Sequence, residues 1–288
     1  GLMLVNPGEA IWVENPGALG ARNAFLACDA RLVPVDIDAE GFSVEDALTK
    51  APDFRLAFVT PSHQQPLGSV MSLSRRLALL QAAKDADAMI VEDDYDGEFY
   101  YGEQPPPTLK SIDTQERVIY VGTFSKSLFP SLRLGYILSP KGLVESFERI
   151  FTTWQSGVPT FNQAIVADFM DEGFFATHVR TMRQLYKQRY EALFEAATEI
   201  REWVDIRPTK SGFHTPGFLK GAVREEEVVE GAAAAGIRTA PLGRYAIAPF
   251  AKKGLVFGFG STPPEEIRSG METLGRVMSR LGGGRQLV

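Results

Sequence analysis

Short apolar runs, separated by stretches of helical length, constrain the fold of this chain more than any other feature. In the first half the runs lie at residues 10–13, 32–35, 56–59, 89–91, 118–121 and 134–138. Between two of them, residues 72–86 place Leu73, Leu77 and Leu80 at the spacing of a helix. Strands that alternate with helices in this way predict βαβ units, and therefore an α/β fold with a mostly parallel sheet flanked by helices.

The second half of the chain has a different pattern. One long helix is predicted from residue 174 to residue 201, followed by short strands near 212–219 and 255–259 and by helices at 225–235 and 264–281. We therefore predict a large domain over residues 1–178. Residues 179–282 are predicted to form a long connecting helix and a small C-terminal α+β domain. The tail, residues 283–288, is predicted to be disordered.

Net charge and the length of the apolar runs argue against two classes of partner. The 288 residues carry 30 Lys and Arg against 36 Asp and Glu, a formal charge of -6, and the phosphates of DNA repel such a chain. No apolar run approaches the roughly 20 residues that span a bilayer, so we expect no membrane association. Cys28 is the only cysteine, which rules out an internal disulfide and fits a reducing cytoplasm.

Polar residues follow three of the predicted strands, at the point where each strand ends. Thr60, Asp93 and Thr123 each end or follow an apolar run. In parallel sheets, ligands bind at the carboxyl ends of the strands. The sequence therefore predicts a binding site at this edge of the sheet.

The run GTFSKSLFPSLRLGY, residues 122–136, places Lys126 among hydroxyl groups and seven residues before Arg133. A lysine after a strand is most often a solvated surface charge. Here Thr123 and Ser125 supply hydroxyl groups, and the planar guanidinium of Arg133 suits a phosphate. A lysine in this company, with a carboxylate nearby, has the parts needed to hold a phosphorylated aldehyde as an imine.

The run VEDDYDGEF, residues 91–99, holds five acidic residues in seven positions directly after a predicted strand. A solvated acidic loop or a metal site would explain such a run, although a calcium loop needs another spacing, with glycine at its sixth position. Asp93, at the end of the strand, has a further explanation: its charge would keep a pyridine nitrogen protonated. We expect no metal in this chain.

Three motifs, in this order, resemble the fold-type-I aminotransferases that use pyridoxal phosphate. They are TPSHQQPLG at residues 60–68, VEDDYDGEF at 91–99 and TFSKSLFPSLRLGY at 123–136. Within that class they resemble the aminotransferase-like domain of MocR-type regulators of the GntR superfamily, which join a winged helix-turn-helix to this domain. The resemblance implies the fold of the type I PLP-dependent transferases, with pyridoxal 5'-phosphate as the cofactor.

The resemblance also implies roles for individual residues. Lys126 corresponds to the lysine that forms a Schiff base with the cofactor, Asp93 to the partner of the pyridine nitrogen, and Tyr95 to the tyrosine that bonds the phenolic oxygen. Gln65 stands where many relatives have an asparagine near that oxygen. His63, in the same loop, either supports this contact or makes structural hydrogen bonds.

At the phosphate end, the resemblance implies that Thr123, Ser125 and Arg133 are ligands. Relatives also cup the phosphate with the backbone amides of a loop rich in glycine and serine, at the N-terminus of a helix. This chain begins just downstream of where that loop is expected. We therefore expect either a fragment of a longer protein or a cofactor cup that lacks one part.

The carboxylate of an amino acid needs an anchor, for which arginine is well suited. Arg244 lies in the region where the family keeps such an arginine, and we predict it as the substrate-binding residue. Arg207 and Arg238 are competing choices.

Two functions fit the motifs, together with a plainer third. The first is an effector-sensing domain of a MocR-type transcriptional regulator, in which bound cofactor forms an aldimine with an amino acid or amine. The alternative is a catalytic class I/II aminotransferase that passes an amino group to a 2-oxo acid. The third is a scaffold that keeps the fold and binds no cofactor. By analogy we expect a homodimer, and contact with DNA only through a winged helix upstream of this chain.

Overall fold

The computed structural model describes residues 3–154 and 160–283, and its larger sheet lies in the first half of the chain. In this described part, seven strands pair in the order β3-β2-β1-β4-β5-β6-β7. Their bounds are β1 Ala10–Asn15, β2 Arg31–Asp38, β3 Gly41–Phe42, β4 Leu56–Val59, β5 Met89–Asp94, β6 Val118–Thr123 and β7 Gly135–Leu138. The five strands between the edges, β2, β1, β4, β5 and β6, run parallel to one another. The edge strands β3 and β7 are antiparallel to their neighbours. The mostly parallel sheet is confirmed.

Helices connect these strands, and most of them begin at a side-chain cap. They are α1 Leu19–Leu26, α2 Val44–Lys50, α3 Leu73–Asp85, α4 Leu109–Ile112 and α5 Phe124–Ser127. Ser43, Ser72 and Thr108 each accept a hydrogen bond from a backbone N–H of the first turn that follows. Because these caps satisfy amides that the helix leaves free, they fix where each helix starts.

The predicted helix at residues 72–86 is confirmed as α3, but its leucines do not all face the core. Leu73 and Leu77 are about half exposed, whereas Leu79 and the whole side chain of Arg76 are buried. Arg76 donates hydrogen bonds to the backbone oxygens of Met71 and Pro61, which lets a guanidinium occupy the inner face.

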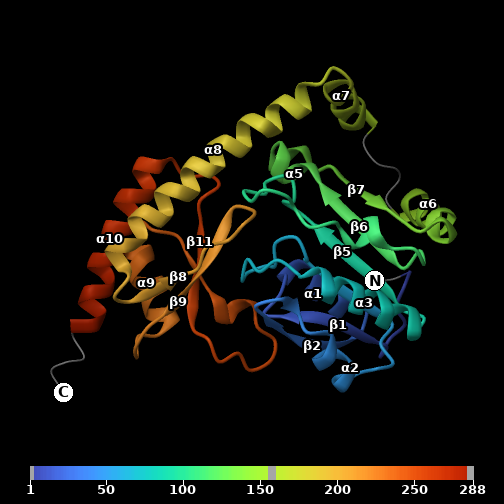
Figure 1. Cartoon of the computed structure of the whole chain (residues 1–288), viewed down its shortest axis with the longest axis horizontal. Coiled ribbons are helices and arrows are strands. Elements are labelled where there is room, and N and C mark those ends of the chain that lie inside the picture. The colour runs from blue at the N-terminus through green and yellow to red at the C-terminus, as the bar shows by residue number, and fades with distance from the viewer. Residues whose placement is uncertain (1–2, 155–159, 284–288) are drawn as a thin grey trace.

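A second, antiparallel sheet follows in the order β10-β11-β9-β8, again counted over the described residues. Its strands are β8 Val204–Ile206, β9 His214–Leu219, β10 Ala240–Pro241 and β11 Gly254–Gly258, with helices α9 Glu225–Ala234 and α10 Pro264–Gly283. The helices α6 Val144–Trp154, α7 Thr160–Asp171 and α8 Phe174–Ala196 lead to it, and short 3-10 turns lie at Pro130–Leu132, Lys141–Leu143, Ala197–Ile200 and Leu242–Tyr245. Figure 1 shows α8 running from α7, beside the large sheet, to the smaller region, where it lies along α10.

Each sheet has its own apolar core. Trp12 stacks on Phe54 in the core of the large sheet, and its indole N–H donates to the Ala51 carbonyl. The second core gathers side chains such as Leu193 and Phe259 from α8 and the end of β11. The division into domains at residue 178 stays a prediction. Residues 284–288 of the predicted disordered tail lie outside the described residues.

Candidate functional site

The carboxyl ends of β1, β4 and β5 lie at one side of the candidate site and supply what we call the buried wall (Glu14, Thr60, His63, Gln64 and Asp96). Glu14 ends inside it and accepts hydrogen bonds from the Thr60 hydroxyl at 2.6 Å, the Thr60 backbone N–H at 3.0 Å and the Gln64 amide at 3.0 Å. Burial raises the pKa of Glu14 to about 7, against the opposing effect of these hydrogen bonds. Most polar atoms of the wall therefore have partners within it, whereas the buried His63 Nε2 and Asp96 Oδ1 have none among the described residues.

The acidic run at the end of β5 and after it contains several carboxylates with hydrogen-bond partners and one, Asp93, without a partner in the described chain. Glu92 accepts from the backbone amides of Leu109 and Lys110, both at 2.8 Å, and Asp94 accepts from the Tyr120 hydroxyl at 2.9 Å. Asp96 pairs with His63. Asp93, by contrast, makes no side-chain hydrogen bond or ion pair within residues 3–154 and 160–283. Three of the five acids thus have structural roles.

Asp93 is half-buried at the end of β5, beside Val121 of β6. Burial raises its pKa to about 7, and the neighbouring carboxylates of Asp94 and Asp96 add to this effect. A carboxyl group held at such a pKa, with no partner of its own in the described chain, favours a cationic ligand group beside it. The Asp93 carboxyl group therefore fits a protonated pyridine nitrogen.

The segment after β6 forms a second side of the site, which we call the lysine segment (residues 123–134). Thr123 caps the short helix α5 by accepting from the Ser125 backbone N–H at 3.1 Å. Lys126 is exposed, and its ammonium makes no hydrogen bond or ion pair with the described residues. Arg133 is also exposed and adopts a left-handed backbone conformation, with φ at 51°.

A cavity of about 1310 Å³ separates these two sides from the smaller region. Five predicted site residues line it, namely Gln65, Asp93, Tyr95, Ser125 and Lys126. His63 lies behind Tyr95 in the buried wall, and Thr123 and Arg133 lie in the lysine segment away from the lining. Across the cavity, Arg238 lines it and the exposed Arg244 does not.

Some residues of the site received no role from the sequence. Glu14 had a visible signal, a lone acid near the end of an apolar strand, but its hydrogen-bond partners lie 46 and 50 positions away. His214 lines the cavity from β9, and burial, followed by the charges of His63 and Lys126, holds its pKa well below the usual range. Nothing in the local sequence around His214 indicated this position.

His63, Asp96 and His214 could be taken for a metal site, because one ligand atom from each lies within 4.8 Å of the others. The shortest of these contacts is a hydrogen bond of 2.8 Å between His63 Nδ1 and an Asp96 oxygen. The backbone of Gly212 also packs directly on both side chains. The geometry favours a hydrogen-bonded pair over a metal centre.

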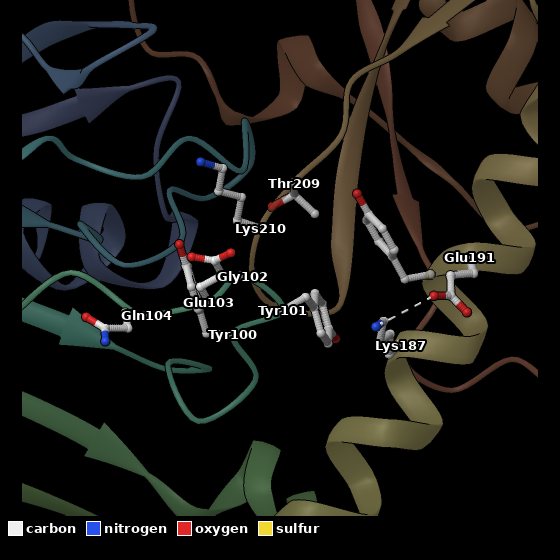
Figure 2. Close-up of a pocket in the computed structure, with 10 residues that line it drawn as sticks. Tyr100, Tyr101, Gly102, Glu103, Gln104, Lys187, Glu191, Thr209 and Lys210 are labelled. Atoms are coloured by element: carbon white, nitrogen blue, oxygen red, sulfur yellow. Dashed lines mark ion pairs between the residues drawn. The ribbon is translucent and has the colours of Figure 1, made fainter.

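A second cavity, of about 570 Å³, lies against α8 and is lined by other residues than the first. Figure 2 shows Tyr100 and Tyr101 on one side, and Lys187 and Glu191 on the helix. Lys187 lies 3.9 Å from Glu191, and both side chains are more than half exposed. None of the predicted site residues lines this cavity, so we do not assign the candidate site to it.

Sequence and fold together are those of one family. A family model described as aminotransferase class I and II matches residues 1–227, and the chain belongs to this family. The large sheet with its smaller antiparallel partner is the fold of the PLP-dependent fold-type-I aminotransferases. Within the described residues, none of the helices has the length and apolarity needed to cross a membrane.

Individual relatives include regulators and enzymes. The chain is 38% identical over 273 residues to a probable rhizopine catabolism regulatory protein, MocR, of Rhizobium meliloti, covering 94% of this chain and 55% of that protein. A kynurenine aminotransferase of Pyrococcus horikoshii, solved in complex with PMP, matches with a TM-score of 0.90 at 27% identity, covering 97% of this chain and 71% of that one. LysN of Thermus thermophilus, complexed with N-(5'-phosphopyridoxyl)-L-leucine, has a TM-score of 0.89 at 25% identity, with 98% and 74% covered.

The chain therefore spans about half the length of the regulator that it matches. Other similar proteins are also helix-turn-helix regulators, of which the chain covers 57% and 58%. The chain is thus similar to the aminotransferase-like part of such regulators.

Proposed function

We propose that this chain is the effector-sensing, aminotransferase-like domain of a MocR-type transcriptional regulator, with pyridoxal 5'-phosphate as its cofactor. One observation carries the proposal: Lys126, Asp93 and Tyr95 line one cavity, and neither Lys126 nor Asp93 has a side-chain partner within the described residues. A lysine amine and a carboxylate with no partner are the groups that the two ends of a pyridoxal ring require.

Each residue has a part in holding the cofactor. Lys126 would attach it through Nζ and Asp93 would face the pyridine nitrogen. Tyr95 would turn its hydroxyl proton from the His63 carbonyl to the phenolic oxygen, with Gln65 beside it. Burial raises the pKa of Tyr95 well above its usual range, so its hydroxyl stays protonated and remains a donor. When bound, pyridoxal phosphate supplies an electron sink for chemistry at an amino group.

The phosphate end is proposed to lie at the lysine segment, with Ser125, Thr123 and Arg133 as ligands. Ser125 lines the cavity, and its hydroxyl makes no hydrogen bond within the described residues. Arg133 is exposed and does not line the cavity. A permanently charged fork is well suited to a phosphate.

Asp93 and Lys126 would hold protons at defined atoms. A cation beside the Asp93 carboxylate lowers its pKa, because it favours the charged form, and the carboxylate in turn keeps that cation protonated. Lys126 Nζ, once free of the cofactor, would carry a proton to or from the bound amino compound. The buried wall would exclude water from this side, because its side chains are buried.

Pyridoxal binding can be tested directly with this chain. Pyridoxal phosphate is added, the visible spectrum is recorded, and the complex is reduced with borohydride and digested for peptide mass analysis. We expect the pyridoxyl group on Lys126. A label on another lysine would contradict the assignment, and no label at all would favour the scaffold that binds no cofactor.

The effector is proposed to be an amino acid or amine, and its carboxylate anchor can be assigned with a matched pair of variants. Arg238 lines the cavity, whereas Arg244 does not. We expect Arg238→Ala to weaken the spectral response to amino acids about tenfold or more, as the loss of a charge-assisted contact does. Arg244→Ala tests the residue that the sequence favoured. If only Arg244→Ala weakens the response, the sequence prediction holds.

The alternative function, a catalytic aminotransferase, is favoured by the similarity to solved aminotransferases. Turnover separates the two. A panel of amino acids is incubated with the holo protein and a 2-oxo acid, and product is counted per site. Many turnovers would refute a domain that only senses, whereas one amino group per site or fewer would refute the enzyme.

The remaining proposals concern the surroundings of the domain. We propose a homodimer, a cytoplasmic location and contact with DNA through a winged-helix domain elsewhere in the protein. The family resemblance and the regulators among the relatives support them. Light scattering of the chain tests the dimer.

A further inference from the structure

A segment of the smaller region docks onto the large domain directly behind the candidate site, and we call it the docking segment (residues 209–214). Its Gly212 N–H donates to the Phe99 carbonyl at 3.0 Å, and the Tyr101 hydroxyl donates to the Gly212 carbonyl at 2.7 Å. Thr209 donates through its hydroxyl to the Gly68 carbonyl at 3.3 Å. The docking segment therefore bonds to both loops that surround Tyr95.

Gly212 makes the closest approach. Its φ is +78°, and an added Cβ would lie 2.0 Å from His63 Nδ1 and 2.3 Å from an Asp96 oxygen. Only glycine fits there, both because of the backbone conformation and because the space is taken. The segment consequently packs with its bare backbone on the His63–Asp96 pair.

The pair itself is buried and bonded to Tyr95. His63 Nδ1 lies 2.8 Å from Asp96 Oδ2, and both side chains are at most 1% exposed. The Tyr95 hydroxyl donates to the His63 carbonyl at 2.9 Å and lies 3.2 Å from His63 Nδ1. A single histidine thus contacts both the docking segment and the phenol that faces the cavity.

We propose that His63 and Asp96 form a positioning pair that couples the docking segment to the orientation of the Tyr95 hydroxyl toward the cofactor. Neither residue of the pair lines the cavity itself, and the pair acts through Tyr95, which does. A shift of the smaller region would change the contact of Gly212 with the pair, and the pair would pass this change to the phenol. The inference rests on the proposed function only for the identity of the group that Tyr95 meets.

Several charged or titratable groups lie near the Tyr95 phenol and would also influence the pH midpoint of a bound cofactor. Asp93, Asp94, Asp96 and Glu14 surround Tyr95, and His214 stands beside His63 with ring centroids 4.4 Å apart. Lys126 faces the same cavity. Variants that keep all of these groups and change only His63 or Gly212 therefore isolate the coupling.

The first test compares two replacements of His63 in the pyridoxal phosphate complex. His63→Phe fills the space without a donor, whereas His63→Asn keeps an N–H near the position of Nδ1. We expect His63→Phe to weaken cofactor binding about tenfold, the effect of losing one hydrogen bond to a charged group. The pH midpoint of the visible band should rise, because a donor to the phenolic oxygen favours its deprotonated form. His63→Asn should restore both values toward wild type.

Equal midpoints in wild type and His63→Phe would overturn the proposal. A His63→Asn protein as impaired as His63→Phe would do the same, because it would show that the hydrogen bond is not the cause. Far-UV circular dichroism and thermal melting of each variant check that the fold is kept.

The second test changes the docking segment and leaves the pair intact. Gly212→Ala places a methyl group on His63 and Asp96. Gly221→Ala is the matched control, since Gly221 has a similar φ of +76° and nothing within 4 Å of an added Cβ. We expect Gly212→Ala to raise the midpoint as His63→Phe does, and Gly221→Ala to leave it unchanged. Equal effects of the two alanines would contradict the coupling.

A third measurement needs no cofactor. Hydrogen exchange of the Gly212 amide, which bonds to Phe99, should be faster in cofactor-free His63→Phe than in wild type or His63→Asn. Unchanged exchange would overturn the coupling even if the spectra shift. If the wild-type chain shows no cofactor band at all, the proposed function fails, and this exchange experiment still decides on the pair.

Discussion

The two sides of the cavity differ in how much of their structure exists without a ligand. In the buried wall, Glu14, Thr60 and Gln64 bond to one another and His63 bonds to Asp96, all at low exposure. In the lysine segment, Lys126 and Arg133 are exposed and Phe129 is 53% exposed. One side is preformed, and the other presents its reactive groups to solvent.

This difference has a physical cause. The buried wall lies at the ends of parallel strands inside the sheet, where unpaired polar groups are costly and must find partners. The lysine segment joins β6 to the edge strand β7, of which Ile137 and Leu138 are exposed. We infer that a ligand would complete the lysine segment, whereas the buried wall behind the cavity would change little. The predictions below test this contrast.

The largest effect is expected at Lys126. Lys126→Ala should abolish covalent attachment of pyridoxal phosphate, because no other amine is proposed to reach it. Since the side chain is exposed and has no partner in the described chain, the stability of the cofactor-free protein should change by less than about 0.5 kcal/mol. Lys187→Ala, in the second cavity, is the control and should keep the absorption band. A large loss of stability in Lys126→Ala would break the contrast.

The next effect is expected at Asp93, which belongs to neither side and faces the cavity between them. Asp93→Asn removes the proposed partner of the pyridine nitrogen, and we expect cofactor affinity to fall about 100-fold, the lower part of what breaking a buried pair costs. Asp94→Asn removes the same charge one residue along while keeping an acceptor for Tyr120, and it should change affinity little. Titration of the visible band measures both. Similar losses in the two variants would show a general charge effect.

Sequence alone anticipated most of the fold, because apolar periodicity is a local signal. The run at residues 56–59 is β4, and the long helix predicted over 174–201 is α8 followed by the 3-10 turn Ala197–Ile200. Short elements such as β3 and β10, with two residues each, were missed because two residues carry no periodicity. The exposed Leu73 and Leu77 were not anticipated, since the buried Arg76 takes the inner face through distant backbone oxygens.

For the site, motifs indicated residues that meet the ligand but not those behind them. Lys126, Asp93 and Tyr95 stand in recognisable runs, and the structure brings them to one cavity, although their roles remain predictions. Gly212 approaches His63 from about 150 positions away in sequence, a contact that only the packing of two domains creates. Arg238 and Arg244 lie six positions apart, so spacing could not decide between them.

A smaller effect, visible as a pH dependence, is expected for Glu14 in the buried wall. Its folded-state pKa is about 7 against the ordinary 4.5. Its favourable contribution to folding is therefore complete below pH 4.5 and is lost as the pH rises through about 7, by at most about 3 kcal/mol. Urea unfolding of the cofactor-free chain should show a smaller decline of stability between pH 5 and pH 8 in Glu14→Gln than in wild type. An equal decline of stability with pH in the two proteins would show that a group other than Glu14 is responsible.

The smallest effect is expected from removing a single hydroxyl group, which can be compared between the buried wall and the lysine segment. The Thr60 hydroxyl is buried, donates to Glu14 and accepts from the Gln65 N–H at 3.2 Å. Thr60→Val keeps the shape and removes these bonds, so we expect a loss of about 1–2 kcal/mol in the free energy of unfolding. Ser125→Ala, in the lysine segment, removes a half-buried hydroxyl that has no partner in the described chain, and the loss should stay below about 0.5 kcal/mol. Urea unfolding of the cofactor-free proteins measures both losses. Saturating pyridoxal phosphate should then increase the difference in free energy of unfolding between wild type and Ser125→Ala, but not the difference between wild type and Thr60→Val. Equal losses in the cofactor-free state would mean that the lysine segment is as preformed as the buried wall.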